Sequence, residues 1–165
     1  MPGHTLGTVT GPETQEHDPA QAVMAAGALF TDEAGSVMLV KPTYKSFWDI
    51  PGGYVERGES PQDACVREVH EELGLKISPG PLLVVDWAPT AKEGGKLLFV
   101  FDGGRLSIEE RNAIQIETRE LVRYEFVPPE RFAEYTIDRL VLRLTAALEA
   151  TSSGVPAYLE HGKRT

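Results

Sequence analysis

The strongest constraint on the fold is a glycine- and acid-rich run between residues 52 and 75, GGYVERGESPQDACVREVHEELGL. Three of its carboxylates, Glu68, Glu71 and Glu72, have the spacing that places side chains on one side of a helix. Carboxylates packed in this way repel one another unless a cation lies among them. Hard divalent cations, Mg²⁺ above all, prefer such oxygen ligands and also bind substrate phosphates. We therefore expect a Mg²⁺ site that handles phosphate.

The same run predicts a loop, a helix and a second loop. Ser60 can cap the helix, Pro61 suits its first position, and Asp63 completes a pattern similar to a capping box. Gly74 supplies the C-terminal stop. At about 100° per residue, the apolar side chains gather on one face and the glutamates on another. The apolar face consists of Cys65, Val66, Val69 and Leu73. One face is expected to pack on a core while the other faces a cleft.

The run resembles the Nudix box at every defining position. Gly53 is followed after five residues by Glu59, and after seven more by Arg67-Glu68-Val69-His70-Glu71-Glu72-Leu73-Gly74-Leu75. The preceding Trp48-Asp49-Ile50-Pro51-Gly52 is similar to the family's lead-in. The resemblance implies an α/β protein with the Nudix fold, a mixed β-sheet sandwiched between helices.

The rest of the chain suits one domain of that kind. Alternating or continuous apolar segments predict strands at 22–30, 37–40, 82–87, 96–101 and 121–127, and a last helix at 137–150. We expect an N-terminal tail over residues 1–20, open to partial order, a single domain over 21–150, and a C-terminal tail over 151–165. The two N-terminal histidines, His4 and His17, lack any metal-ligand spacing and are interpreted as part of the solvated tail.

The last helix has a clear amphipathic pattern. Arg139 and Arg143 fall outside its apolar stripe and are expected to face solvent. The stripe consists of Ile137, Leu140, Val141, Leu144 and Leu148. In the C-terminal tail, Tyr158-Leu159 is expected to be an anchoring patch.

The composition of the chain limits the kinds of molecule that it is expected to bind. A net charge of −9 argues against a nucleic-acid polymer, because such binders usually carry a basic face. A phosphorylated small molecule remains compatible when metal ions neutralise the contact. The single cysteine excludes an intrachain disulfide, no secretory signal is visible, and no apolar run is long enough to span a bilayer. We expect a cytoplasmic protein without a membrane partner. The resemblance is compatible with a homodimer, which nothing in the sequence requires.

The resemblance also implies a reaction and its residues. Nudix enzymes hydrolyse a nucleoside diphosphate linked to another group by attack of water on phosphorus, with Mg²⁺ as cofactor and Mn²⁺ as a substitute. Carried over position by position, Glu68, Glu71 and Glu72 are the catalytic, metal-binding carboxylates. The backbone carbonyl of Gly52 joins them as a ligand. Glu68 is either a ligand or the general base, because the family varies in which carboxylate takes the proton.

Other box residues have structural roles in the family. Glu59 and Arg67 match positions that form an internal ion pair, which holds the loop against the helix. We prefer this structural role to a catalytic one, because arginine suits bidentate pairing with a carboxylate. Gly53 and Gly74 serve backbone geometry.

Candidate residues outside the box are less specific. Many family members add a carboxylate shortly before a late strand, and Glu120 is the best match, with Glu117 second; a solvated loop charge is the alternative. Lys41, at a strand end, is a candidate phosphate contact, and a solvated lysine is the alternative. Tyr44, Phe47 and Trp48 are candidates for stacking on a base, with core packing as the alternative for each.

The box does not name the substrate. Two enzymatic interpretations remain: a MutT-like nucleoside triphosphate pyrophosphatase, favoured by the short chain, and an ADP-ribose or nucleotide-sugar pyrophosphatase. The non-enzymatic alternative is a Nudix-fold nucleotide sensor. Sensors typically lose box carboxylates or add a DNA-binding domain, whereas this chain retains its three glutamates. An EF-hand and a P-loop are excluded by their missing motifs.

Overall fold

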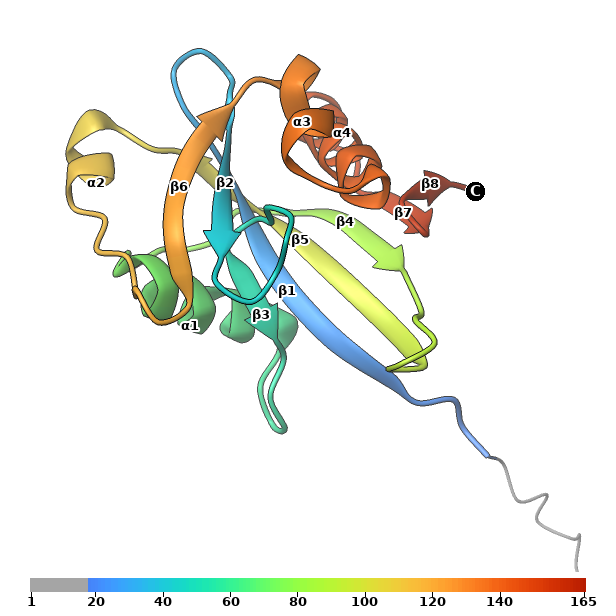
Figure 1. Cartoon of the computed structure of the whole chain (residues 1–165). Coiled ribbons are helices and arrows are strands. Elements are labelled where there is room, and N and C mark those ends of the chain that lie inside the picture. Colours follow the sequence, from blue (N-terminus) through green and yellow to red (C-terminus); the bar gives the residue numbers. More distant parts are fainter. Residues whose placement is uncertain (1–17) are drawn as a thin grey trace, which may run out of the picture.

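The computed structural model describes residues 18–165, which form one sheet with helices on both of its faces (Figure 1). The strands are β1 (Ala22–Thr31), β2 (Val37–Pro42), β3 (Gly52–Tyr54), β4 (Leu82–Trp87), β5 (Gly95–Arg105), β6 (Leu121–Val127), β7 (Ala157–Glu160) and β8 (Lys163–Arg164). The helices are α1 (Pro61–Leu73), α2 (Ile108–Asn112), the 3₁₀ turn η1 (Pro129–Arg131), α3 (Phe132–Tyr135) and α4 (Asp138–Ser153). Most of the expected N-terminal tail, with its two histidines, lies outside the described residues. Within residues 18–165, no helix combines the length and the apolar character needed to cross a membrane.

The sheet is mixed, as the sequence predicts. Its strand order is β6-β2-β1-β5-β4-β7-β8, and β3 pairs with β1 off this path. Strand β1 runs parallel to β5 but antiparallel to β2 and β3, and β4 runs antiparallel to β5 but parallel to β7. A parallel neighbour requires a crossover connection, and the segment between β3 and β4 that contains α1 belongs to such a crossover from β1 to β5.

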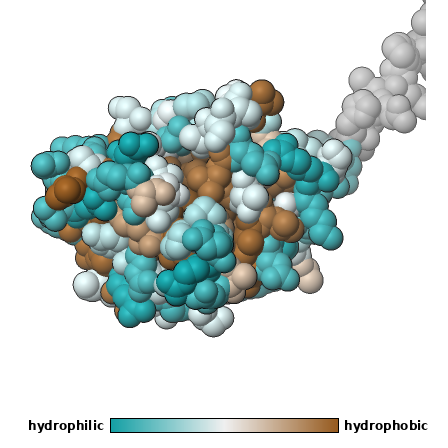
Figure 2. Space-filling view, turned by 90° about the horizontal axis from the view of Figure 1, so that it is seen from above, coloured by the Kyte–Doolittle hydropathy of each residue, from teal (hydrophilic) through white to brown (hydrophobic). Residues whose placement is uncertain are grey.

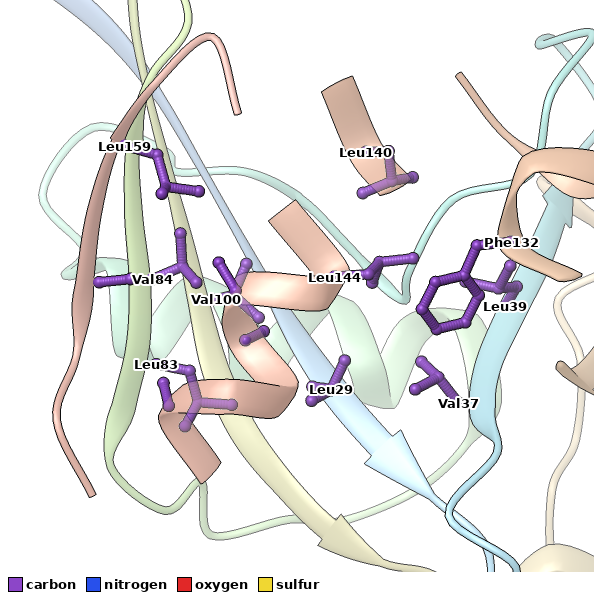
Figure 3. Close-up of a cluster of buried hydrophobic side chains, with 14 of the residues drawn as sticks. Leu29, Val37, Leu39, Leu83, Val84, Val100, Phe132, Leu140, Leu144 and Leu159 are labelled. Carbon is purple, nitrogen blue, oxygen red and sulfur yellow. The ribbon is translucent and has the colours of Figure 1, made fainter. Parts of the chain in front are cut away.

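Helices α1 and α4 cover opposite faces of this sheet. Successive side chains of a strand point to opposite faces, so β1 contributes to two separate cores. Ala28 and Phe30 pack in the core beneath α1, whereas Leu29 packs in the core beneath α4. Figure 3 shows Leu140 and Leu144 of α4 within the second core, together with sheet residues of β1, β2, β4 and β5.

Helix α1 has the limits that its sequence predicts. The Ser60 hydroxyl oxygen accepts a hydrogen bond from the Asp63 backbone N–H at 3.1 Å, and the Asp63 carboxylate accepts one from the Ser60 N–H at 3.4 Å. The helix ends at Gly74, which adopts the left-handed conformation with φ of 69°. Cys65 and Val69 are fully buried on its apolar face. The loop–helix–loop prediction is confirmed.

The C-terminal segment differs from the expected tail. Helix α4 continues to Ser153, and β7 then pairs with β4 while β8 pairs with β7. Ala157 and Leu159 are buried, whereas Tyr158 points outward and is exposed. Only Leu159 of the expected anchoring patch is therefore an anchor. The strand was missed because two buried residues in a four-residue segment are too short a pattern to stand out.

Two expectations for α4 are wrong. Arg139 is exposed, as predicted, but Arg143 is largely buried and forms an ion pair with the fully buried Asp86 of β4. The residue at the helix N-cap, Ile137, is 37% exposed instead of buried. The stripe argument counts only apolar residues, so it cannot detect a charged residue that is buried by pairing with a distant partner.

Candidate active site

A cleft of about 260 Å³ opens beside β3 and the first half of α4. Its floor lies on the α4 face of the sheet and includes Leu98 and Val100 of β5. The loop over residues 44–50 forms one wall, and Leu140 of α4 contributes to another. Figure 2 shows that apolar side chains form a band between polar margins on one face of the molecule. The cleft therefore combines an apolar interior with a few polar groups, which is typical of small-molecule sites.

Gly52 connects the cleft to α1. Its backbone N–H donates a hydrogen bond to Oε2 of Glu72 at 2.9 Å. Gly52 has φ of 150°, and a Cβ at this position would lie 2.3 Å from the backbone oxygen of Ala26. Only glycine fits so close to the neighbouring strand. The glycine thus allows β3 to pair with β1 while it holds the Glu72 carboxylate at the edge of the cleft.

Burial dominates the electrostatics of Glu72, whose exposed fraction is 4%. Desolvation raises the pKa of its carboxyl group to about 8, although the hydrogen bond from Gly52 opposes the shift. The nearby carboxylates of Glu68 and Glu120 raise it further. The folded protein therefore brings the exposed Glu120 carboxylate near the partly buried Glu68 and the buried Glu72, where a cation would favour the charged forms of all three.

A single guanidinium group organises the other box carboxylates. Arg67 pairs with Glu59 through two hydrogen bonds, Nη2 to Oε1 at 2.7 Å and Nε to Oε2 at 3.2 Å. Its Nη1 donates to Glu68 at 2.8 Å and to Glu71 at 3.2 Å, and its Nη2 also donates to the Tyr54 carbonyl at 3.0 Å. The ion pair that the family resemblance implies for Arg67 and Glu59 is present, and it lowers the pKa of Glu59 through the hydrogen bond from Arg67.

Gly53 leaves room for the Glu68 carboxyl group. A Cβ at Gly53 would lie 2.3 Å from Cδ of Glu68, and 2.4 and 2.6 Å from its two oxygens. The Glu68 carboxylate therefore occupies the space that a side chain at residue 53 would fill. Burial raises the pKa of Glu68, while its hydrogen bond with Arg67 opposes the shift. In the sequence, this glycine could be assigned only a general role in backbone geometry.

The donor set suits a hard divalent cation, because carboxylate and carbonyl oxygens are the groups that Mg²⁺ prefers. Within residues 18–165, however, no three His, Cys, Asp or Glu side chains form a ready metal-binding group. Glu68 and Glu71 are instead held by Arg67. The carboxylates therefore have the right chemistry for the ion and lie near one another. The oxygens of Glu68 and Glu71, however, are arranged around the Arg67 guanidinium group.

The structure distinguishes the two candidate carboxylates outside the box. Glu120 precedes β6 in an exposed loop, and its carboxylate lies near enough to Glu68 and Glu72 to raise both pKa values. The Glu117 carboxylate is instead paired with Arg119, with Nε and Oε1 2.9 Å apart. Glu120 is thus the one whose charge acts on the box.

The residues at the end of β2 and in the loop before β3 differ in whether they line the cleft. Tyr44 and Phe47 line the cleft, and Tyr44 is 71% exposed. Lys41 is not among the cleft-lining residues, and its ammonium group donates to the Lys45 carbonyl. Lys45 lines the cleft instead and forms an ion pair with Asp49 at 2.6 Å.

Several cleft residues had no signal in the sequence. At the mouth, the Lys96 ammonium group lies 2.9 Å from Glu93 and 4.8 Å from the centre of the Tyr54 ring. Arg139 and Arg143 of α4 also line the cleft. These residues come from separate elements, so only the packing of the sheet brings them together.

Comparisons with known proteins agree with this architecture. The family model described as the NUDIX domain matches residues 21–146. A MutT-like protein of Streptomyces ambofaciens is 22% identical over 147 residues, which are 89% of this chain and 90% of that protein. The 8-oxo-dGTP diphosphatase of Proteus vulgaris is 34% identical over 70 residues, which are 40% of this chain and 62% of that enzyme. The alignment therefore spans less than two thirds of the second relative.

A solved structure extends the comparison to the fold. The MutT protein from Methanosarcina mazei Go1 superposes with a TM-score of 0.65 at 24% sequence identity. The superposition covers 81% of this chain and 95% of that protein. The sheet and its two covering helices are therefore a known arrangement.

Proposed function

The chain belongs to the NUDIX family, and we propose that it cleaves a pyrophosphate bond in a nucleoside diphosphate linked to another group, with nucleoside triphosphates as the favoured substrates. As a member of this family it is a hydrolase of phosphorus-containing anhydrides. One observation carries the proposal: Gly52 holds the Glu72 carboxylate, and Gly53 leaves space for the Glu68 carboxylate, beside a cleft with an apolar interior.

The carboxylates are the proposed metal ligands. Glu68, Glu71 and Glu72, with the carbonyl of Gly52 and the carboxylate of Glu120, would hold Mg²⁺, for which Mn²⁺ is a substitute. When bound, the ion neutralises phosphate charge and lowers the pKa of the attacking water. The Gly52 N–H keeps one of these ligands, the Glu72 carboxylate, in place.

The proposed reaction is a simple displacement at phosphorus. The oxygen of a water molecule forms a bond to one phosphorus atom, and the bridging P–O bond breaks with its electron pair leaving on the departing phosphate. The proton of the water passes to a box carboxylate; Glu68 is our candidate for this role, as the alternative to its role as a metal ligand. Arg67, which donates to Glu68 and Glu59, fixes the orientation of that carboxylate.

The cleft favours a substrate with one nucleoside. Its volume of about 260 Å³ lies close to the lower end of the range of about 300–1,000 Å³ that is typical of ligand pockets. Tyr44 and Phe47 are available for base stacking, which contributes about 1–3 kcal/mol per base. A nucleoside triphosphate, ADP-ribose and a nucleotide sugar each present one base to such a site, and the substrate panel below distinguishes them.

Further expectations belong to the same proposal. One domain, which begins near residue 21 and extends past residue 150 to include β7 and β8, carries the activity, and its substrate is a small molecule rather than a nucleic-acid polymer. A cytoplasmic location and a homodimer need measurements of their own, cell fractionation for the first and analytical sedimentation for the second.

The test is a substrate panel with the purified protein and Mg²⁺. The panel contains canonical and oxidised deoxynucleoside triphosphates, ADP-ribose, NADH, dinucleoside polyphosphates and nucleotide sugars, and released phosphate or pyrophosphate is measured. Glu71→Gln and Glu72→Gln should each lower turnover by about 10²-fold or more, in line with the loss of one preorganised charged group. Glu134→Gln, a surface change in α3, is the matched control.

The outcomes separate the alternatives. Turnover of triphosphates supports the favoured substrate, whereas turnover of ADP-ribose or nucleotide sugars alone replaces it. Tight nucleotide binding without turnover of any compound would refute the hydrolase and indicate a sensor.

A further inference from the structure

A buried ion pair lies behind the cleft wall that α4 forms. The Asp86 side chain is 0% exposed, and its Oδ2 accepts a hydrogen bond from Nε of Arg143 at 2.8 Å and lies 2.7 Å from Nη2 in the same ion pair. The other oxygen, Oδ1, accepts the backbone N–H of Gly162 at 3.0 Å. One carboxylate therefore holds together β4, α4 and the turn between β7 and β8. The Arg143 guanidinium is fixed in position and orientation.

The pairing leaves the opposite edge of the Arg143 guanidinium available. A guanidinium carries five N–H donors; Asp86 accepts the one on Nε, and its Oδ2 also lies 2.7 Å from Nη2. Among residues 18–165, every side-chain nitrogen or oxygen that is buried from solvent has a hydrogen-bond partner. Nη1 of Arg143 has no partner among these residues, so it is not one of the buried atoms. Nη1 is thus accessible, and Arg143 lines the cleft. The edge formed by Nη1 and Nη2 is therefore the part of the guanidinium that has donors left for a molecule in the cleft.

The surroundings favour a neutral acceptor over a phosphate at this edge. The Asp86 carboxylate cancels the charge of Arg143, so the pair presents donors without net charge. The neighbouring lining is apolar and includes Leu98, Val100 and Leu140. A phosphate would gain little attraction from a neutral pair, whereas a planar base can bury its faces there and still satisfy its polar edge.

We infer that Arg143 selects the nucleobase of the substrate by donating two hydrogen bonds to O6 and N7 of a 6-oxopurine, and that Asp86 is the positioning residue that holds its guanidinium. Arginine donates to this pair of acceptors in the commonest specific contact between proteins and guanine. Adenine has an amino group at position 6, where a 6-oxopurine has a carbonyl oxygen. This amino group is a hydrogen-bond donor, so it cannot accept a hydrogen bond from the Arg143 guanidinium. The inference rests on the proposed function and narrows its substrate to hypoxanthine and guanine nucleotides.

The test measures binding without turnover. Inosine, guanosine and adenosine monophosphates contain no pyrophosphate bond, so their dissociation constants can be measured by titration calorimetry in Mg²⁺ buffer. We expect the two 6-oxopurine nucleotides to bind at least about tenfold more tightly than AMP, as one bidentate contact allows. Arg143→Lys keeps a cation for Asp86 but lacks the planar guanidinium that can donate two parallel hydrogen bonds. It should reduce the ratio of 6-oxopurine to AMP affinity to about twofold or less. Arg131→Lys, in the exposed η1 turn outside the cleft, should keep the wild-type ratio.

The role of Asp86 has its own readout. Asp86→Asn should raise KM for inosine triphosphate and leave kcat nearly unchanged, because the base contact is made equally in the ground state and the transition state. A purely structural residue would lower the melting temperature without changing the ratio of IMP to AMP affinity. If Arg143→Lys does not fold, the double variant Asp86→Leu with Arg143→Met removes both buried charges and is measured in its place.

Two results would overturn the inference: equal affinity of the wild-type protein for AMP and IMP, or a folded Arg143→Lys protein that keeps the wild-type ratio. Failure of the proposed function is a separate result. A protein that prefers IMP but turns over nothing in the substrate panel would retain the base selection and lose the hydrolase assignment.

Discussion

Substituting Gly53 with alanine should separate catalysis from stability. The new Cβ would lie 2.3–2.6 Å from the Glu68 carboxyl atoms, whereas ordinary contacts begin at 3.4 Å. The carboxyl group must therefore move by about 1 Å, and a misplacement of about 1 Å can lower a rate by roughly 10²-fold. The obstructing atoms are the end of a flexible side chain, so the structural cost is a strained rotamer of about 1 kcal/mol. In a domain of this size, that cost lowers the melting temperature by about 2–4 °C.

The assay compares kcat/KM and thermal unfolding for Gly53→Ala and a matched glycine variant. Gly80→Ala is the control, because a Cβ there would meet Asp102 Cβ at 3.2 Å, away from the cleft. We expect the control to keep full activity. Activity of Gly53→Ala within about threefold of the wild type would refute the reasoning, since Glu68 would then not need its present position. A fall of more than about 10 °C would also refute it, because the cost would not lie in one movable side chain.

Three further predictions concern stability and reactivity. Asp86→Ala leaves the Arg143 guanidinium without its buried partner and should cost about 3–5 kcal/mol in urea unfolding, and a cost below about 1 kcal/mol would contradict the burial argument. The pKa of Cys65 is raised to about 12 by burial, so iodoacetamide at pH 8 should leave the native thiol unmodified and react only after unfolding, whereas rapid native labelling would show the thiol to be accessible. The pKa of Glu59 is lowered by its hydrogen bond with Arg67, so this pair stabilises the fold above about pH 4.5 and the effect is lost as the pH falls through the lowered value. The difference in melting temperature between wild type and Glu59→Gln should therefore shrink in acid, and a difference that grows in acid would reverse the sign of this linkage.

The local part of the site could be predicted from sequence. The limits of α1 follow from Ser60, Pro61 and Gly74, which act on backbone groups within a few residues of themselves. The helical repeat then places Glu68 and Glu72 near each other whatever the rest of the chain does. For the same reason, the box could be recognised without knowledge of the strand order.

Other features depended on distant contacts. Lys45, instead of Lys41, lines the cleft because the loop folds back over its own backbone. The residues from 157 to 160 form a strand because β4 offers them an unpaired edge, although their own pattern is too short to indicate one. In each case the deciding interaction is with a segment that local periodicity does not describe.

The sequence alone therefore determined the chemistry of the carboxylate helix, because capping and helical periodicity act over a few residues. Only the tertiary structure decided what surrounds that helix. Arg143 shows the reason most clearly: on its own helix it belongs to the polar side, but Asp86, 57 residues earlier in the chain, buries and orients it against the cleft. Such a pairing forms only when the sheet brings β4 beneath α4, and no pattern within either segment indicates its partner.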